Sequence, residues 1–385
     1  MLTTLPDRAR VVLGFAALGL FWGAWGAALP AVQESAGVTA RQLGLALLAI
    51  GAGALPAMRL AGRLLDRYGG RMLASGAVLF GGTAVLPAVA RDAWTLGAAL
   101  FLIGAASGGF DVLLNGAGVA QEARSGRPLM SLAHAGFSAT VVVVSLATGL
   151  ARAAGGSALL VLGTVGAMIV LIGAVLPPRD PATLPAHGRA GMHLSGSGGW
   201  RSTPRILLVL GALGSLAYLV ENAQQNWSAL HLERTLGAAP QVSALGPALF
   251  ATATALARFT AAALPDRIGD RLMIQLGATI AAAGTALVAV AFSVPTTLVG
   301  VVIAGIGTAV CAPTLISLAG RQVPAQRRGR AIATVTALSY LGFLAGPAYV
   351  GVIAGWAGLP AGLGAVAVVA VVLAVGAVAI PKPRS

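Results

Sequence analysis

Asp66-Arg-Tyr-Gly-Gly-Arg71 and Asp266-Arg-Ile-Gly-Asp-Arg271 are two copies of one pattern, D-R-x-G-x-R, and they lie 200 residues apart. Each copy follows one long apolar run and precedes another. A pattern that returns once in an equivalent context indicates that a structural unit occurs twice in the chain. The repeat therefore predicts a protein built from two equivalent halves.

The sequence around the repeat consists of apolar runs long enough to cross a bilayer, which takes roughly 20 mainly apolar residues as a helix. The alternation of polar and apolar residues that marks a membrane β-barrel is absent, so each run is predicted to be a helix. Proline inside a run predicts a kink, as at Pro313. The expected helices cover approximately residues 11–32, 42–62, 71–91, 93–116, 129–150, 156–177, 205–230, 242–264, 271–292, 295–317, 329–353 and 357–380.

Composition supports a membrane protein and argues against other classes. Of the 385 residues, 57% are hydrophobic and 9% are charged, whereas a soluble domain has about 25% charged residues. The net charge of +14 would suit a nucleic-acid binder, but the arginines form short clusters between apolar runs. Cys311 is the one cysteine, which excludes a disulfide framework. We expect contact with the lipid bilayer and none with nucleic acid.

The distribution of basic residues predicts the orientation in the membrane. With the N-terminus inside, 19 Lys and Arg residues fall on the cytoplasmic side and four in the outer loops, which is a strong positive-inside asymmetry. Both termini are then cytoplasmic, and a bacterial inner membrane is expected. A Pro-, Gly- and Ser-rich stretch at 178–204 has the composition of a linker, so the predicted domains are 1–177 and 205–385.

Four stretches carry a resemblance to a known family. Gly62-Arg-Leu-Leu-Asp66-Arg-Tyr-Gly-Gly-Arg71 resembles the loop after helix two of the major facilitator superfamily. The other three resemble a group of poorly characterised bacterial inner-membrane proteins that is distantly similar to fucose-type proton symporters. That group tends to carry an acidic residue where Asn226 stands. The three stretches are Phe110-Asp111-Val-Leu-Leu-Asn115, Gly126-Arg-Pro-Leu-Met-Ser131 followed by His134, and Glu221-Asn-Ala-Gln-Gln-Asn226-Trp227-Ser228.

The resemblance implies an all-α fold of 12 transmembrane helices in two pseudo-symmetric six-helix bundles, which rock about a central cavity. It also implies that the repeated loops hold the cytoplasmic side closed. The alternative is a positive-inside loop with ordinary helix caps. Arg59 and Arg258 occupy matching places before the two loops, where a gating ion pair and snorkelling to the surface are both open. The expected cytoplasmic gate comprises Asp66, Arg67, Gly69, Arg71, Asp266, Arg267, Gly269, Arg271, Arg59 and Arg258.

Two of the 11 acidic residues, Asp111 and Glu221, lie inside apolar runs. A charged side chain at the centre of a bilayer costs about 2.5–3.5 kcal/mol on insertion scales, so each is a candidate functional group. We expect Asp111, Glu221 and His134 to take part in proton coupling, with Asp111 and His134 as a possible relay. The alternatives for Asp111 are a structural hydrogen bond between its helix and the next, or a place in the gate.

The run that holds Glu221 is the most polar of the expected helices, and its amides cannot all face lipid. We therefore expect it to line a substrate cavity, and a tryptophan there can stack on a cyclic solute. The alternative for the tryptophans is the membrane interface, where Trp is common. The expected cavity residues are Glu221, Gln225, Asn222, Asn226, Asn115, Trp22, Trp25 and Trp227.

Together these features predict a proton-coupled secondary transporter of a small polar organic solute that works as a monomer. The main alternative is a proton-driven exporter of a drug or secondary metabolite; a sensor on the same fold and a channel are further alternatives. The sequence has no Walker-type phosphate loop, no nucleophile elbow and no metal-ligand spacing among its four histidines. No enzyme activity, cofactor or metal is therefore expected.

Overall fold

The computed structural model describes residues 6–176, 205–263, 268–324 and 327–380. The described residues contain helices and no strand. By contacts, the chain separates into two compact units. Unit 1 is Met1–Gly191 with Ala239–Ala248, and unit 2 is Met192–Ala238 with Leu249–Ser385. The predicted linker 178–204 lies outside the described residues, so the predicted domain boundaries stay predictions.

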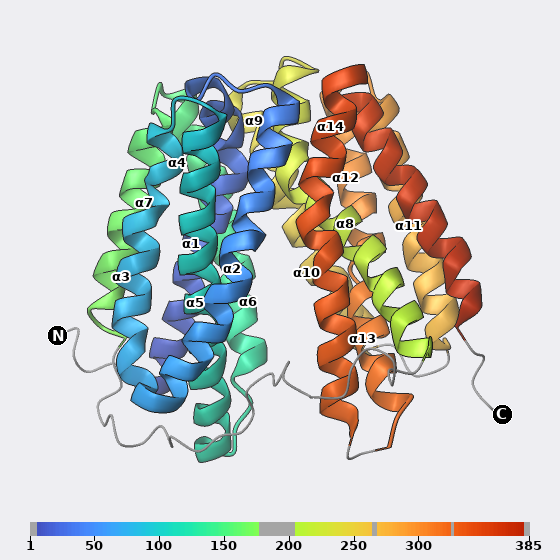
Figure 1. Cartoon of the computed structure of the whole chain (residues 1–385). Helices are drawn as coiled ribbons and strands as arrows, with labels where there is room; N and C mark the ends of the chain where they lie inside the picture. The colour runs from blue at the N-terminus through green and yellow to red at the C-terminus, as the bar shows by residue number, and fades with distance from the viewer. Residues whose placement is uncertain (1–5, 177–204, 264–267, 325–326, 381–385) are drawn as a thin grey trace. The chain divides into compact units, whose positions relative to one another are not determined.

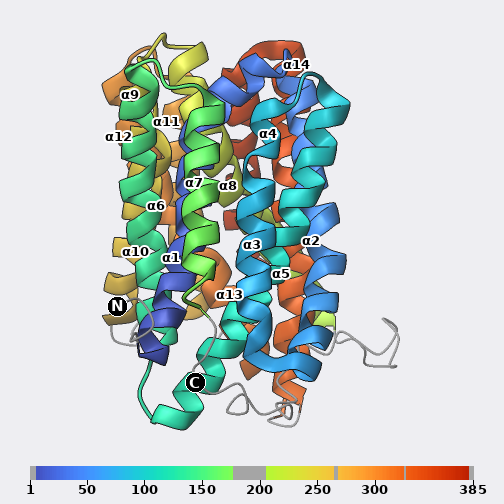
Figure 2. The same cartoon turned by 90° about the vertical axis from the view of Figure 1, so that its left-hand side faces the viewer.

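Unit 1 contains the first seven α-helices and the short helix α9 (Figure 1). Its helices pack mainly in pairs: α2 against α5, α1 against α6, and α3 against α7. The α3–α7 pair can be followed in both views (Figures 1 and 2). The helices are α1 (Asp7–Ser35), α2 (Ala40–Tyr68), α3 (Met72–Ala84), α4 (Leu86–Val89), α5 (Ala93–Ser125), α6 (Met130–Ala153), α7 (Ala158–Gly173) and α9 (Pro240–Ser243).

Unit 2 is built around α8, which packs against α14 along much of its length. Helix α11 packs against both α12 and α14, and a core of buried leucine, alanine and valine side chains fills the space between α8, α11, α13 and α14. Helix α10 begins in unit 1 and continues in unit 2. The helices are α8 (Arg205–Arg234), α10 (Leu245–Ala263), α11 (Asp270–Val290), α12 (Val294–Thr308), α13 (Cys311–Arg321) and α14 (Arg328–Gly376).

Nine helical segments of the described chain are long and apolar enough to cross a membrane. Two of them, Ala40–Val89 with 50 residues and Arg328–Ala379 with 52 residues, are more than twice as long as one crossing requires. If each counts as two crossings and the apolar 16-residue helix Ala158–Gly173 as one, the described part of the chain supplies twelve. This tally is consistent with the predicted number.

Helix boundaries differ from the predicted ones where local backbone chemistry intervenes. The predicted helix 295–317 is divided into α12 and α13 at Ala309 and Val310, four and three residues before Pro313. The predicted helices 329–353 and 357–380 both lie within α14, and Gly358 marks a kink between them with the non-helical backbone angles φ +84° and ψ 165°. Such a conformation favours glycine, which has no Cβ. Helix α5 continues to Ser125, nine residues beyond its predicted end.

Asp92 caps the N-terminus of α5 and should make its stability depend on pH. Its Oδ1 accepts hydrogen bonds from the backbone N–H groups of Thr95, at 2.8 Å, and Trp94, at 2.9 Å. These bonds, with a third from the Thr95 hydroxyl, favour the carboxylate, and the pKa of Asp92 is lowered. A lowered pKa in the folded state means that the cap stabilises fully above the unfolded pKa of about 3.9 and loses its contribution as pH falls through the folded value.

We therefore expect Asp92→Ala to lower the melting temperature of the purified protein at pH 7 and to have a smaller effect as the pH falls below about 4. Asp92→Asn is the matched control, because asparagine caps a helix without a charge. It should keep most of the stability at pH 7 and show no such pH dependence. Equal destabilisation by Asp92→Ala at pH 7 and pH 3 would contradict this assignment.

Candidate functional site

The polar segment of α8 lies inside unit 2, within a helix that continues through it without interruption. The residues Glu221, Asn222 and Asn226 are buried, with exposed fractions of 8%, 3% and 8%. Burial of this many polar groups requires hydrogen-bond partners, because an unpaired polar atom in a low-dielectric interior is costly. The partners of each side chain therefore indicate what the segment does.

Glu221 forms an ion pair with Arg258, which reaches it from α10. Arg258 Nη2 lies 3.1 Å from Glu221 Oε1 and 3.3 Å from Oε2. The Glu221 side chain is 10% exposed and the Arg258 side chain 44% exposed, so the carboxylate is the enclosed member of the pair. From the sequence, Arg258 was expected either to snorkel to the surface or to form a gating ion pair. Its contact with Glu221 was not predicted.

Arg258 is also fixed to the break between α12 and α13. Its Nε donates a hydrogen bond of 3.1 Å to the carbonyl oxygen of Ala309. In a regular helix that carbonyl would accept from the residue four positions later, which here is Pro313, and proline has no N–H to donate. The kink predicted at Pro313 thus exposes a backbone acceptor, and Arg258 uses it while it holds Glu221.

The amides of α8 are arranged in separate rows along the helix. Gln225 donates to Glu221 at the long distance of 3.5 Å, and Asn226 Nδ2 donates to Asn222 Oδ1 at 2.9 Å. Since residues four apart share a helix face, Glu221 and Gln225 form one row, and Asn222 and Asn226 form another. The second row faces α14, where the Cβ atom of Asn222 lies close to Gly346.

In unit 1, Asp111 and Asn115 form the hydrogen-bonded pair that their spacing predicts. Asn115 Nδ2 donates to Asp111 Oδ1 at 3.0 Å and to the Asp111 backbone carbonyl at 2.9 Å. His134 in α6 acts electrostatically on the Asp111 carboxyl group. The His134 ring lies 2.9 Å from the Met130 carbonyl through Nδ1 and packs 4.8 Å from the Phe15 ring. The hydrogen bonds of Asp111 and His134 thus lie within their own helices and the two residues interact through charge, so the relay stays a prediction.

The three expected tryptophans have different surroundings. Trp25 is 2% exposed and stacks on Phe21 at 5.9 Å between ring centroids, within an aromatic group of unit 1. Trp22 is half-buried and meets Phe21 edge-on at 5.2 Å. Trp227, in unit 2, is fully buried. Trp22 is therefore the most accessible of the three to a solute.

The first repeated loop lies at the end of α2. Asp66, Arg67 and Arg71 are exposed, and Gly69 ends the helix with φ +62°, a conformation that favours glycine. Arg59, which precedes Asp66 in α2, is also exposed. In the second loop, Asp266 and Arg267 lie outside the described residues, while Gly269 precedes α11 and Arg271 lies in its first turn.

Near the second loop, sequence analysis missed an ion pair. Arg321 Nη2 at the end of α13 lies 2.6 Å from Asp270 Oδ1 at the start of α11. Asp270 occupies the second variable position of the repeated pattern, where the first copy has Gly70, and this difference was the available signal. Within the described residues no group of three or more His, Cys, Asp or Glu side chains is placed to hold a metal ion.

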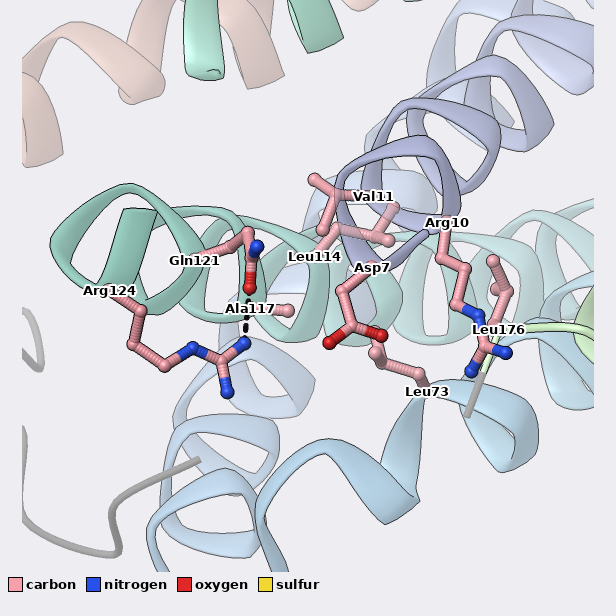
Figure 3. A pocket seen from close by; sticks show the side chains of 9 residues that line it. All are labelled: Asp7, Arg10, Val11, Leu73, Leu114, Ala117, Gln121, Arg124 and Leu176. Carbon is pink, nitrogen blue, oxygen red and sulfur yellow. Dashed lines mark hydrogen bonds between the residues drawn. The ribbon is translucent and has the colours of Figure 1, made fainter. Parts of the chain in front are cut away.

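A small pocket at one end of unit 1 lies apart from all predicted residues (Figure 3). It is enclosed mainly by apolar side chains, and the dashed line in the figure joins Gln121 to Arg124. Arg10 in its wall is 7% exposed. The pocket is lined by Asp7, Arg10, Val11, Leu73, Leu114, Ala117, Gln121, Arg124 and Leu176.

Comparison with known proteins decides the family. Residues 217–385 match the family model of the Major Facilitator Superfamily. An uncharacterised MFS-type transporter of Yersinia pestis is 32% identical over 390 residues, covering 98% of this chain and 97% of the relative. The chain belongs to the major facilitator superfamily. The membrane protein MosC of Rhizobium meliloti is 30% identical over 377 residues, covering 95% of this chain and 88% of that protein.

Solved structures show the same fold. The nucleoside transporter NupG aligns with a TM-score of 0.84 at 13% identity, over 99% of this chain and all of NupG. A bacterial homologue of the lysosomal transporter Spinster aligns with a TM-score of 0.76 at 14% identity, over 97% of both chains. This confirms the predicted all-α fold class, and the sequence relatives confirm the predicted superfamily. This MFS protein is a multi-pass membrane transporter.

Proposed function

We propose that this transporter moves a small polar organic solute by alternating access and couples that movement to protons. The observation that carries the proposal is the ion pair between Glu221 and Arg258, held inside unit 2 at the break between α12 and α13. A carboxylate in a membrane segment is retained only where it has a partner or a polar path. Here a proton or a polar group of the solute can replace Arg258 as that partner. The ion pair should therefore open when the transporter binds a proton or its solute.

In this proposal Asp111 carries the coupling proton and His134 passes it on. The support is the hydrogen bond from Asn115 to Asp111 within α5 and the electrostatic interaction of Asp111 with His134 of α6, a residue type suited to a relay. Substrate binds near Glu221 and the amides of its helix. Uptake powered by an inward proton gains about 2.3 kcal/mol per 100 mV of membrane potential, which is ample for concentrating a solute.

The proton role predicts the behaviour of Asp111→Asn. This variant keeps the hydrogen bond to Asn115 but cannot release a proton, so we expect active uptake to fall more than tenfold while exchange of solute across the membrane persists. The measurement compares both activities in proteoliposomes with and without a pH gradient. Asp92→Asn, outside the relay, is the control. Unchanged uptake and unchanged pH dependence in Asp111→Asn would remove Asp111 from the mechanism.

The solute can be found by thermal stabilisation of the purified transporter across a panel of sugars, sugar acids, amines and drugs. A hit is then tested for its direction of movement. Alkalinisation of the medium around de-energised cells on solute addition supports uptake with protons. Raised sensitivity of a deletion strain to one compound class, without an uptake defect, would instead support an exporter.

The proposal also covers orientation and gating. The excess of arginine in alternate loops supports a bacterial inner-membrane transporter with both termini in the cytoplasm, working as a monomer. The exposed residues Asp66, Arg67 and Arg71 and their counterparts in the second copy then form the cytoplasmic gate. Reporter fusions placed in successive loops test the orientation, since alternate loops should report opposite sides.

A further inference from the structure

One face of α8 carries four polar side chains that play no part in the ion pair or the relay. Gln224, Trp227, Ser228 and His231 are separated by three and four residues and so share that face. All four are completely buried, with exposed fractions of 0%. Sequence analysis missed His231, although its spacing from Ser228 and Trp227 would have shown that it extends the row.

This face presents hydrogen-bonding atoms that protein groups do not satisfy. Gln224 Nε2 donates to Thr285 Oγ1 of α11 at 3.1 Å. Within the described part of the chain, Gln224 Oε1, Trp227 Nε1 and Ser228 Oγ have no hydrogen-bond partner. The Val288 backbone of α11 lies where it can bond to one His231 ring nitrogen, and the other ring nitrogen has no partner. Buried polar atoms nearly always have partners, so four such atoms on one face indicate a bound ligand.

The chemistry of the face selects the ligand. None of the four side chains carries a charge when His231 is neutral. Helix α12, which also packs on α8, has no titratable residue in Val294–Thr308. On α11, Asp270 and Arg271 lie in the first turn, about four turns before Thr285. Trp227 donates, Gln224 Oε1 accepts, and Ser228 and neutral His231 do both. A fitting ligand must both donate and accept, as a hydroxyl group does.

We propose that Gln224, Trp227, Ser228 and His231 form an internal, uncharged site that binds hydroxyl groups. The hydroxyl belongs either to resident water, which typically makes about three hydrogen bonds when buried, or to the transported solute. The second source rests on the proposed function, while the first does not. In both cases His231 stays neutral and acts as a hydrogen-bond partner, distinct from the ion pair on the neighbouring row of α8.

The site can be observed directly through His231. The chain has only four histidines, so the other three can be replaced. In a variant with His134, His187 and His193 each replaced by glutamine, isotope-labelled histidine reports His231 alone. Solid-state NMR of this protein in lipid bilayers then reads the ring nitrogens. We expect a neutral ring with one tautomer, hydrogen-bonded and in magnetisation exchange with water. Displacement of the water signal by a neutral polyhydroxy solute, either the sugar D-glucose or the sugar alcohol D-sorbitol, but not by gluconate, would identify the solute as the source.

A dry ring, with no water exchange and no response to any of these solutes, would overturn the proposal. Failure of proton-coupled transport would leave the water result unaffected, so the two hypotheses fail separately. A second measurement uses the full-length protein with its histidines intact. If Ser228 holds a ligand, Ser228→Ala lowers the melting temperature; if its hydroxyl is buried without a partner, the same change raises it.

Ser215→Ala is the matched control for that measurement. Ser215 is on the same helix, and its hydroxyl donates to the Leu338 carbonyl of α14, so its partner belongs to the protein. Its replacement should lower the melting temperature without changing the His231 ring signals. Ser228→Ala, in contrast, should change both. Unaltered ring signals in Ser228→Ala would separate Ser228 from His231 and contradict a shared site.

Discussion

Arg258→Met is expected to destabilise this transporter by roughly 3 kcal/mol and to reduce transport at least tenfold. Removal of one partner from a buried ion pair typically costs 3–5 kcal/mol, because the other charge stays buried without compensation. The lower end applies here, since the Arg258 side chain is 44% exposed while that of Glu221 is 10% exposed. The variant also leaves the Ala309 carbonyl without the donor that replaces the missing N–H of Pro313.

The double variant Glu221→Gln/Arg258→Met separates the two causes of the lost stability, which are the unpaired Glu221 charge and the unpaired Ala309 carbonyl. It removes the unpaired charge, so we expect it to recover part of the lost stability in denaturant or thermal unfolding and to recover no coupled transport. Arg258→Lys keeps the charge but cannot reach both Glu221 and Ala309 with one planar fork, and it should fall between wild type and Arg258→Met. Arg59→Met, at the matching place in α2, is the stability control. A double variant less stable than Arg258→Met would contradict the pair.

Gly104→Ala is the second change expected to have a large effect, because it places a methyl group between two helix backbones. In unit 1, a Cβ atom on Gly104 of α5 would lie 2.0 Å from the Ile50 carbonyl oxygen and 2.6 Å from its carbon in α2. Neither backbone atom can move aside without moving its helix. Overpacking of this kind costs about 1–3 kcal/mol and occasionally more, so we expect a clear drop in melting temperature and in the yield of folded protein.

Gly97→Ala is the matched control, since it makes the same chemical change in the same helix. A Cβ atom at Gly97 has no neighbour within 4 Å, and alanine favours helix over glycine by about 1 kcal/mol in soluble hosts. Gly97→Ala should therefore be neutral or slightly stabilising. If both variants melt alike, close backbone contact between α2 and α5 does not hold unit 1 together, and small residues there serve another purpose.

The fold class was predictable because lipid leaves the backbone few choices. A run of about 20 apolar residues must be a helix if it crosses a bilayer, and the repeated D-R-x-G-x-R pattern indicated two halves. The breaks were less predictable. Pro313 indicated a kink, but the place of the kink between the last two predicted helices, at Gly358 in α14, depends on the backbone conformation there. The length of α5 depends on a polar end that hydropathy does not register.

The candidate site was predictable in part. Asp111 and Glu221 were found because a carboxylate is costly in an apolar run, and the bond between Asp111 and Asn115 follows from their spacing of four residues. The partner of Glu221 could not be found in this way. Arg258 lies 37 residues later, and the two meet only because its side chain reaches from α10 to Glu221 and to the broken helix. His231 escaped notice because histidine is not costly enough to stand out.

The sequence by itself determined that this protein lies in a lipid bilayer, that it is helical, and at which positions a charged side chain requires a partner. Hydrocarbon imposes these features because polar and charged groups are costly in it. The tertiary structure decided which charges meet, which backbone carbonyl replaces a lost partner, and which face of α8 points inward with unsatisfied hydrogen-bonding atoms. The reason is physical: the cost of burying a group is local to the residue, whereas the partner that offsets this cost is supplied by another helix.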